Sequence, residues 1–306
     1  MIFLVMNSNY TEIVMNDIFS KQNTPVFIER FRAQGRSYDK VKDYSMWGII
    51  ISIFVVLVLN ILKFFIDSEG LCYAALVYGL FSSVACLILD NIKKNRKSFA
   101  ARIQQLIDCE LFGISWWRNW GVKPAIEDIQ EAAQGESPDR YYNWYDESIN
   151  SVSKDAAVII CFRGNVMYDH KLRKKFMRTL HYCFWSLVAI ITIVSLCYNP
   201  SIKNFLCYEV SPMMPIIVLY VRTWLMENAD TANLISIRTD VESMKQKLIN
   251  GESINRDEFL MVQDEIFAHR KNCFDIPSRF YNKYKTQNEE SFHDLCVRLS
   301  EELAGH

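Results

Sequence analysis

The chain has 306 residues, of which 50% are hydrophobic and 23% charged, and its formal net charge is -1. A charge so close to zero excludes wholesale binding to DNA or RNA, which needs a strongly basic surface. The hydrophobic residues are concentrated in a few long runs, which is typical of a membrane protein. The 9 cysteines form no C-x-x-C pair and no cluster with histidine, so we expect neither a disulfide framework nor a metal site.

Residues 1–45 precede the first long hydrophobic run. Apolar residues such as Phe27 and Phe31 recur in this segment at helical spacing, and Pro25 interrupts the pattern. The opening "MIFLVMNSNY" has neither a basic region nor a long hydrophobic region, so we expect no cleaved signal peptide. We predict a helical N-terminal segment.

Residues 46–90 contain two hydrophobic runs, 46–66 and 71–89. Each run has about 20 residues, the number that a helix needs to cross roughly 30 Å of hydrocarbon. Only "DSEG" separates the two runs, and the second run carries no charge. This pattern predicts a transmembrane hairpin of two antiparallel helices.

Residues 179–225 predict a second transmembrane hairpin. Its first run, 179–198, is long enough to span the membrane. Its second run contains two prolines and two charged residues: Glu209, Pro212, Pro215 and Arg222. The prolines lie near one end and the charges near opposite membrane surfaces, so we expect this run to span as well. A buried or re-entrant segment is the alternative.

The remaining parts are a loop, 91–178, and a tail, 226–306. The tail predicts one helix that closes at Gly251 and another that opens near Ser253, an N-cap candidate. No part of the chain has a sustained strand pattern. We therefore predict an all-α membrane protein, with four transmembrane helices in two hairpins. The N-terminal segment, the loop and the tail would pack together as a mainly helical cytoplasmic part.

Lysine and arginine residues determine the expected orientation. They gather before the first run, after the second and before the third, whereas the two short turns contain one of them, Lys203. Positive charge marks the cytoplasmic side, so we predict that both termini and the loop 91–178 are cytoplasmic.

The sequence contains no motif of an enzyme. G-x-G-x-x-G, Walker, H-E-x-x-H and G-x-S-x-G patterns are all missing, and the 5 histidines are scattered. No Asp, Glu, Lys or Arg lies near the middle of a run, which disfavours an ion-coupled transporter. We expect no catalytic residue, no metal and no cofactor.

The stretch "CFRGNVMYDHKLRKKF" leads directly into the third run. It places Asn165, Asp169 and Arg173 four residues apart, on one helix face. As a ligand site, Arg163 and Arg173 would hold phosphate oxygens while Asn165 and Asp169 recognise polar edges. The alternative is a hydrogen-bonded network on the helix surface. Topology alone also explains most of this basic charge.

Two other stretches combine aromatic and basic residues. "DCELFGISWWRNW" contains Trp116, and "QDEIFAHRKNCFDIPSRFY" contains Arg270 and Tyr281. Aromatic rings stack on bases in nucleotide sites. The alternative is that they anchor the chain at the membrane surface or fill a small core.

Mildly polar residues occur inside the hydrophobic runs. Ser52 and Asn60 share one face of the first run, and Thr192 and Ser195 are neighbours in the third. They either form hydrogen bonds between helices or line an aqueous path. Four helices leave no open lumen, so a pore would require several subunits.

Four local strings together resemble one known family. "IQQLIDCELFGISWW" carries Gln104 or Gln105, Asp108, Phe112, Gly113 and Trp116, and "WYDES" carries Trp144 and Tyr145. "ICFRGNVMYDHKLRKKF" carries Cys161, Arg163, Asn165, Asp169, Leu172 and Arg173, and "QDEIFAHR" is followed by Pro277 and Tyr281. These strings resemble the SMODS-associated four-transmembrane pore-forming effectors of bacterial cyclic-oligonucleotide (CBASS) antiphage defence.

The resemblance has departures. Phe162 stands where the family usually has Gln, Ile114 where it has Leu, and Trp117 where Asn is common. A ligand contact made by that Gln or Asn is therefore not carried over to this chain.

The resemblance implies a function and partners. A cyclic-nucleotide synthase would make a cyclic di- or oligonucleotide, which binds the cytoplasmic part of an effector in the inner membrane. The effector would then form a homo-oligomer and breach the lipid bilayer. The implied ligand residues are Trp116, Tyr145, Arg163, Asn165, Asp169, Arg173, Arg270 and Tyr281. The alternative is a membrane scaffold, or a small channel-like protein, that senses no nucleotide.

Overall fold

The computed structural model describes residues 16–50, 58, 62, 69–198, 202–205 and 211–304. Every regular element in these ranges is a helix, as the sequence predicts. Two of the predicted pore-lining residues, Ser52 and Asn60, lie outside the described residues.

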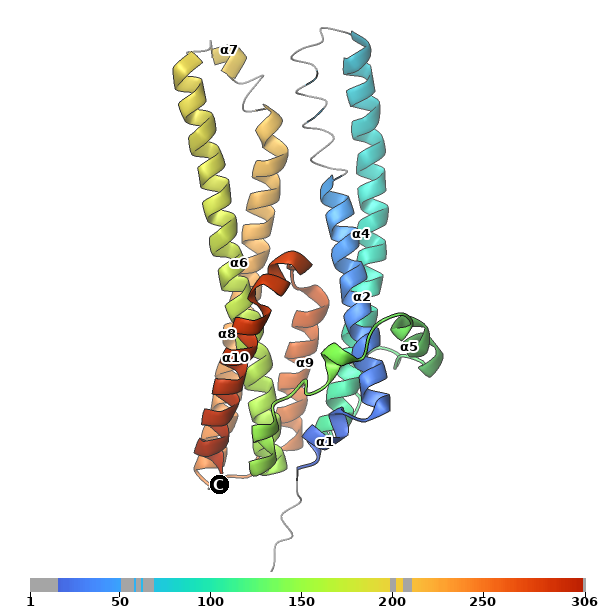
Figure 1. The fold of residues 1–306 in the computed structure, drawn as a ribbon, viewed down its shortest axis with the longest axis vertical. Helices are drawn as coiled ribbons and strands as arrows, with labels where there is room; N and C mark the ends of the chain where they lie inside the picture. Colours follow the sequence, from blue (N-terminus) through green and yellow to red (C-terminus); the bar gives the residue numbers. More distant parts are fainter. Residues whose placement is uncertain are drawn as a thin grey trace, which may run out of the picture.

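Two pairs of long helices dominate the structure (Figure 1). Helix α2 (Pro25–Ile49) packs against α4 (Glu69–Phe112), and α6 (Lys154–Tyr198) packs against α8 (Ser211–Ile249). The short helix α7 (Ile202–Phe205) follows α6 at the far end of the second pair. In each pair the two helices run antiparallel.

The long helices exceed the thickness of a membrane. Helix α6 has 45 residues, and at 1.5 Å per residue it extends about 68 Å, roughly twice the hydrocarbon thickness. Helices α4, α6 and α8 therefore continue without a break through the predicted boundaries at residues 90, 178 and 225. Each of them belongs to both the predicted membrane part and the predicted cytoplasmic part.

The half of the molecule that holds α7 exposes large hydrophobic side chains. They include Leu87 of α4 and Leu196 of α6, which expose 72% and 76% of their surface. Within the described ranges, one segment, Lys154–Cys197 of α6, is long and apolar enough to cross a membrane. Exposure on this scale is uncommon on a surface that faces water and fits contact with lipid.

The other half is a packed helical module built from segments far apart in the chain. The shorter helices here are α1 (Ile18–Gln22), α5 (Ile126–Ala133), α9 (Arg256–Asn272) and α10 (Ser278–Leu303). Three 3-10 turns, η2 (Arg118–Trp120), η3 (Asp139–Tyr141) and η4 (Glu147–Ser151), lie in the connection between α4 and α6. Residues of the N-terminal segment, the loop and the tail share one hydrophobic core, which contains Ile18, Ile107, Ile159, Phe259 and Cys296.

Aromatic rings form the centre of this core. The Phe112 ring lies 5.6 Å from the Tyr145 ring and 5.5 Å from the Phe162 ring, measured between centroids, and Phe162 lies 6.4 Å from Phe259. These residues come from α4, the loop, α6 and α9. Burial of such large rings stabilises the module, since each removes about 150–250 Å² of apolar surface from water.

The N-cap of helix α9 lies two residues after the predicted one. Ser253 is not the cap; Asn255 is, because its side chain accepts a hydrogen bond from the backbone N–H of Asp257, and the Glu258 carboxylate accepts one from the backbone N–H of Asn255. This reciprocal pair is a capping box, which Ser253 lacks. Gly251, the predicted helix end, follows α8 with φ 76°, a conformation that favours glycine.

Gly164 allows α10 to lie close against α6. A Cβ atom added at position 164 would clash with the Phe292 ring of α10. A larger residue at this position would push α10 away from α6.

We expect the substitution Gly164→Ala to destabilise the protein by about 1–2 kcal/mol, because overpacking outweighs the gain in helix propensity. Thermal unfolding in detergent micelles would measure this loss. In a Phe292→Ala background the same substitution should become stabilising, because the clash is gone. Gly48→Ala is the matched control, since a Cβ atom there meets no atom of the described residues within 4 Å. An equal effect of Gly164→Ala in both backgrounds would contradict the proposed contact.

Candidate functional site

A buried cluster around Asp108 joins α4 to α9. The Asp108 carboxylate accepts hydrogen bonds from Arg270 Nη1 at 2.5 Å, the Tyr145 hydroxyl at 2.9 Å and Gln263 Nε2 at 3.2 Å. Asn165 of α6 donates to the Tyr145 hydroxyl at 3.2 Å. Only 2% of the Asp108 side chain is exposed, so these donors replace the water that a carboxylate needs.

The same cluster explains the state of Tyr145. Burial, followed by the negative charge of Asp108, raises the pKa of Tyr145 well above its ordinary value. The phenol therefore stays protonated, and its O–H group donates a hydrogen bond to Asp108. Tyr145 is 1% exposed, and in this arrangement it has no free face for stacking on a base.

A second cluster surrounds Arg173, where α6 meets α8. Its guanidinium donates to Asp169 at 3.0 Å, Glu227 at 2.9 Å and Asp230 at 3.0 Å, and also to the Phe274 carbonyl at 3.1 Å. Only 3% of the Arg173 side chain is exposed. A phosphate can reach this arginine only after the cluster opens.

The segment after α9 binds the Arg173 cluster to α4. The backbone N–H of Phe274 donates to Asp230 at 2.7 Å. Lys97 of α4 donates to the Cys273 carbonyl and forms an ion pair with Asp275. Lys97 and Arg173 thus hold one short segment, 273–275, from two sides.

The Arg173 cluster contains more acidic than basic groups. Arg173 and Lys97 face four carboxylates: Asp169, Glu227, Asp230 and Asp275. Although burial opposes it, the charge of Arg173 holds the pKa of Asp169 well below its ordinary value. Burial raises the pKa of Glu227 to about 7, despite Arg173 and with a further contribution from Asp230. The excess acid is therefore accommodated by a proton that Glu227 retains near neutral pH.

Helix α9 connects the two helix pairs through these clusters. Near its middle, Gln263 contacts Asp108 of α4, and one turn before its end His269 Nε2 lies 2.7 Å from Asp169 of α6. Trp120 Nε1 adds a hydrogen bond of 2.6 Å to Asp264. In Figure 1, α9 lies between the α2–α4 pair and the α6–α8 pair. A movement of α9 must therefore break or carry with it contacts to both pairs.

The other predicted ligand residues lie outside the two clusters. Arg163 lies on α6 beside α8, and its Nε is 3.9 Å from Glu242. Trp116 is half-buried, donates to the Gly121 carbonyl at 3.0 Å and carries Lys123 over its ring. Tyr281 packs beside the Tyr168 ring and under Lys42. The structure does not bring these three residues into one pocket.

Two predicted pore-lining residues can be placed. Thr192 is exposed and its hydroxyl donates to the Val188 carbonyl of its own helix at 2.9 Å. The Ser195 hydroxyl oxygen is buried and has no hydrogen-bond partner among the described residues. Neither residue forms a hydrogen bond between helices in this part of the chain.

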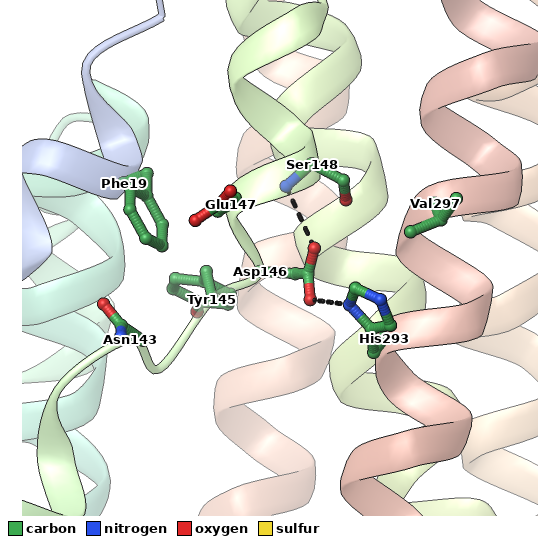
Figure 2. Close-up of a pocket in the computed structure, with 8 residues that line it drawn as sticks. All are labelled: Phe19, Asn143, Tyr145, Asp146, Glu147, Ser148, His293 and Val297. Atoms are coloured by element: carbon green, nitrogen blue, oxygen red, sulfur yellow. Dashed lines mark hydrogen bonds and ion pairs between the residues drawn. The ribbon is translucent and has the colours of Figure 1, made fainter.

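Figure 2 shows a cavity of about 450 Å³ between α1, the loop and α10. Asp146 lines it and accepts hydrogen bonds from the backbone of Ser148 at 2.9 Å and from His293 Nδ1 at 2.6 Å. Glu147 adds a second carboxylate to the lining. Two acidic side chains against one histidine disfavour a phosphate-bearing ligand here.

A family described as the SMODS-associating 4TM effector domain matches residues 16–296. The chain belongs to this family. The resemblance drawn from the four sequence strings is thereby confirmed. No curated protein and no solved structure matches the chain significantly.

The matched region of this 4TM effector chain contains both clusters. Residues from all four family-like strings meet in them: Asp108, Tyr145, Asn165, Asp169, Arg173, Gln263 and Arg270. The alternative of a hydrogen-bonded network therefore describes the arrangement of Asn165, Asp169 and Arg173 in this structure. It is a network between helices, however, and not one on a helix surface.

Sequence reasoning missed several members of these clusters. The charge of Lys97 was attributed to topology, Glu227 and Asp230 were not singled out, and His269 was one of the scattered histidines. A usable signal was present for Gln263, because "QDEIFAHR" places this amide on the same face as Ile266, Phe267 and Arg270.

We expect Arg173→Ala to destabilise the 4TM effector chain by about 3–5 kcal/mol, because three carboxylates lose their buried cation. Thermal unfolding in detergent would report this loss. Arg178→Ala is the matched control on the exposed surface of the same helix and should change stability by less than about 0.5 kcal/mol. Equal stability of both variants would show that the Arg173 cluster contributes nothing.

Glu227 predicts a dependence of stability on pH. Its pKa rises from an ordinary 4.5 to about 7 on folding. Its contribution to the free energy of unfolding is therefore complete below pH 4.5 and is lost as the pH rises through about 7. We expect Glu227→Gln to remove about 3 kcal/mol of this decline in the free energy of unfolding. Unfolding measured from pH 5 to 8, with the exposed Glu301→Gln as control, would test it. An unchanged decline would exclude Glu227 as its source.

Proposed function

We propose that this chain is a membrane effector of a cyclic-oligonucleotide antiphage system. A cyclic di- or oligonucleotide, made by a partner synthase, binds the helical module. The chain then forms a homo-oligomer and permeabilises the bacterial inner membrane, with the module and both termini on the cytoplasmic side. The membership of the 4TM effector family supports the effector role.

One structural observation carries the proposal: α6 is a single helix from the module to the apolar end. It begins at Lys154, contributes the buried Phe162 to the module core and ends at Tyr198. A continuous hydrogen-bonded helix transmits a tilt or rotation along its length without loss at a hinge. A ligand that moves the module end of α6 would therefore also move its apolar end.

We propose that helix α9 can occupy two alternative positions relative to the two helix pairs. In the resting arrangement it is bound to α4 through Asp108 and to α6 through Asp169. A ligand shifts this arrangement only if it binds the two positions with different affinity. Binding that releases one cluster would change how the two helix pairs lie against each other.

Permeabilisation requires more than one chain. Four helices enclose no lumen, so a pore must form between subunits. The exposed apolar faces of α4 and α6 would then exchange lipid for neighbouring subunits. Thr192 and Ser195, together with Ser52 and Asn60, are the proposed polar lining of that path.

Two rival functions make different predictions. A scaffold or a small channel-like protein without nucleotide sensing would behave identically with and without ligand. We propose no catalytic role, no metal and no cofactor for the chain, and we propose no binding of DNA or RNA, because a net charge of -1 gives the chain no overall excess of positive charge.

Dye release from liposomes tests the proposal. We expect wild-type protein to release dye only when one member of a panel of cyclic di- and trinucleotides is added. Asp108→Asn should lower the nucleotide concentration at half-maximal release about tenfold, because a loosened α9 reduces the free-energy cost of the shift. Asp139→Asn, an exposed carboxylate of the same module, is the control. Release that is independent of nucleotide in the wild type would support the channel-like alternative, and no release at all would support the scaffold.

A further inference from the structure

Three basic residues form a stripe along α6 that the two buried clusters do not use. Arg163, His170 and Lys174 are separated by seven and four residues. This spacing places them within about 40° of one another around the helix axis. Arg173, which binds the carboxylates, lies on a different face of the helix. The stripe therefore belongs to another surface of the module.

Arg238 of α8 joins this stripe. Helices α6 and α8 pair in antiparallel register, as shown by the contacts of Arg163 with Glu242, at 3.9 Å, and of Arg173 with Asp230, at 3.0 Å. Arg238 lies one helical turn from Glu242 toward the Asp230 contact. It consequently lies beside the turn of α6 that follows Arg163.

The positive charge of the stripe is poorly neutralised. Glu242 lies 3.9 Å from Arg163, but its other oxygen already holds Lys245 at 2.7 Å. Within the described ranges, no ion pair joins His170, Lys174 or Arg238 to an acidic side chain. Lys174 and Arg238 therefore differ from Arg173 and Arg270, which form ion pairs with buried carboxylates.

Neighbouring cations contribute to the lowered pKa values of two residues in the stripe. Burial, and then the charge of Arg238, lowers the pKa of Arg163. Burial, and then the charges of Lys174 and Arg238, lowers the pKa of His170, although Asp169 opposes this shift. Burial is the main cause of both shifts, and the neighbouring cations add to it more than the nearby carboxylates offset.

The length of the stripe separates two sources of anions. Arg163 and Lys174 are eleven residues apart, which corresponds to about 17 Å along the helix. Lys174 lies only five residues before the predicted membrane run, whereas Arg163 lies far below it. A lipid headgroup would reach Lys174 but not Arg163 or Arg238. A soluble molecule with several negative charges fits the whole stripe.

We propose that Arg163, His170, Lys174 and Arg238 form the phosphate-binding site for the cyclic oligonucleotide, between α6 and α8. This inference rests on the proposed function and names the residues that recognise the phosphodiester groups. An anion held here would replace repulsion between α6 and α8 with attraction to a shared ligand. The two helices would draw together at the module, and their continuations would move in the membrane.

The test uses the full chain in nanodiscs of neutral lipid and two variants with the same change in net charge. Arg163→Gln with Arg238→Gln removes charge from the stripe. Arg256→Gln with Arg298→Gln removes exposed charges elsewhere. Calorimetry with tripolyphosphate, a base-free anion, measures the site itself. We expect the stripe variant to bind at least about tenfold more weakly and the control to bind like the wild type.

Two further arms keep the outcome unambiguous. Arg163→Lys with Arg238→Lys retains the charge and should retain most of the binding. Nanodiscs that contain anionic phospholipid should leave binding unchanged; loss of binding there would mean that headgroups fill the stripe, and would overturn the proposal. Equal binding by the stripe variant and the wild type, or no binding by the wild type, would overturn it as well.

Dye release separates this inference from the proposed function. If a cyclic nucleotide triggers release from the wild type and the stripe variant at the same concentration, the stripe is not the site although the proposed function stands. If tripolyphosphate binds the stripe but no cyclic nucleotide of the panel triggers release, the anion site stands and the proposed function fails. Loss of release in the stripe variant alone supports both.

Discussion

A guanidinium withdrawn from water must be neutralised where it lies, and this requirement organises the module. Arg173 is almost fully buried, and its bonds lead to α6 itself, to Glu227 and Asp230 of α8 and to the backbone after α9. Leaving a buried charge unpaired costs several kcal/mol. These segments are therefore held together at the level where α6 leaves the module, and the remaining packing is built around that point.

Helix length gives the cluster its functional meaning. A membrane-spanning helix needs about 20 residues, whereas α6 has 45 and α8 has 39. The additional residues of both helices pack inside the module and do not form separate linkers. In the proposed function, sensing and permeabilisation are consequently assigned to the same helices. Helix α9 lies between the two pairs, so the pairs are coupled through it rather than through a flexible connection.

The polar residues of this chain divide into two groups with different roles. Those in the family-like strings, such as Asp108, Gln263 and Arg270, satisfy one another inside the module. Such networks specify one packing of the helices, because each member is costly to leave unpaired. Arg238 has no ion-pair partner among the described residues, and Arg163 has only the 3.9 Å contact with Glu242; these two cations belong to the anion site proposed above. A recurrent polar motif is thus compatible with a structural role, and unneutralised charge is the better indication of a ligand.

The sequence by itself determined the features that depend on neighbours along the chain. Hydrophobic runs, helical periodicity and Gly251 sufficed to predict the all-α class, the pairs of long helices and the break between α8 and α9. The N-cap of α9 was placed two residues too early, because the capping box depends on the hydrogen bond that the Glu258 carboxylate accepts from the Asn255 backbone.

Only the tertiary structure decided which polar groups meet. Asp108 and Arg270 are 162 positions apart, and Arg173 and Glu227 are 54 apart. No periodicity within one helix encodes such pairs, since they arise from how separate helices pack. For the same reason, the sequence provided no ground to prefer Arg163 or Arg173 as the phosphate ligand. Burial and ion pairing in the folded chain distinguish the two, because the charge of Arg173 is already neutralised by the carboxylates around it.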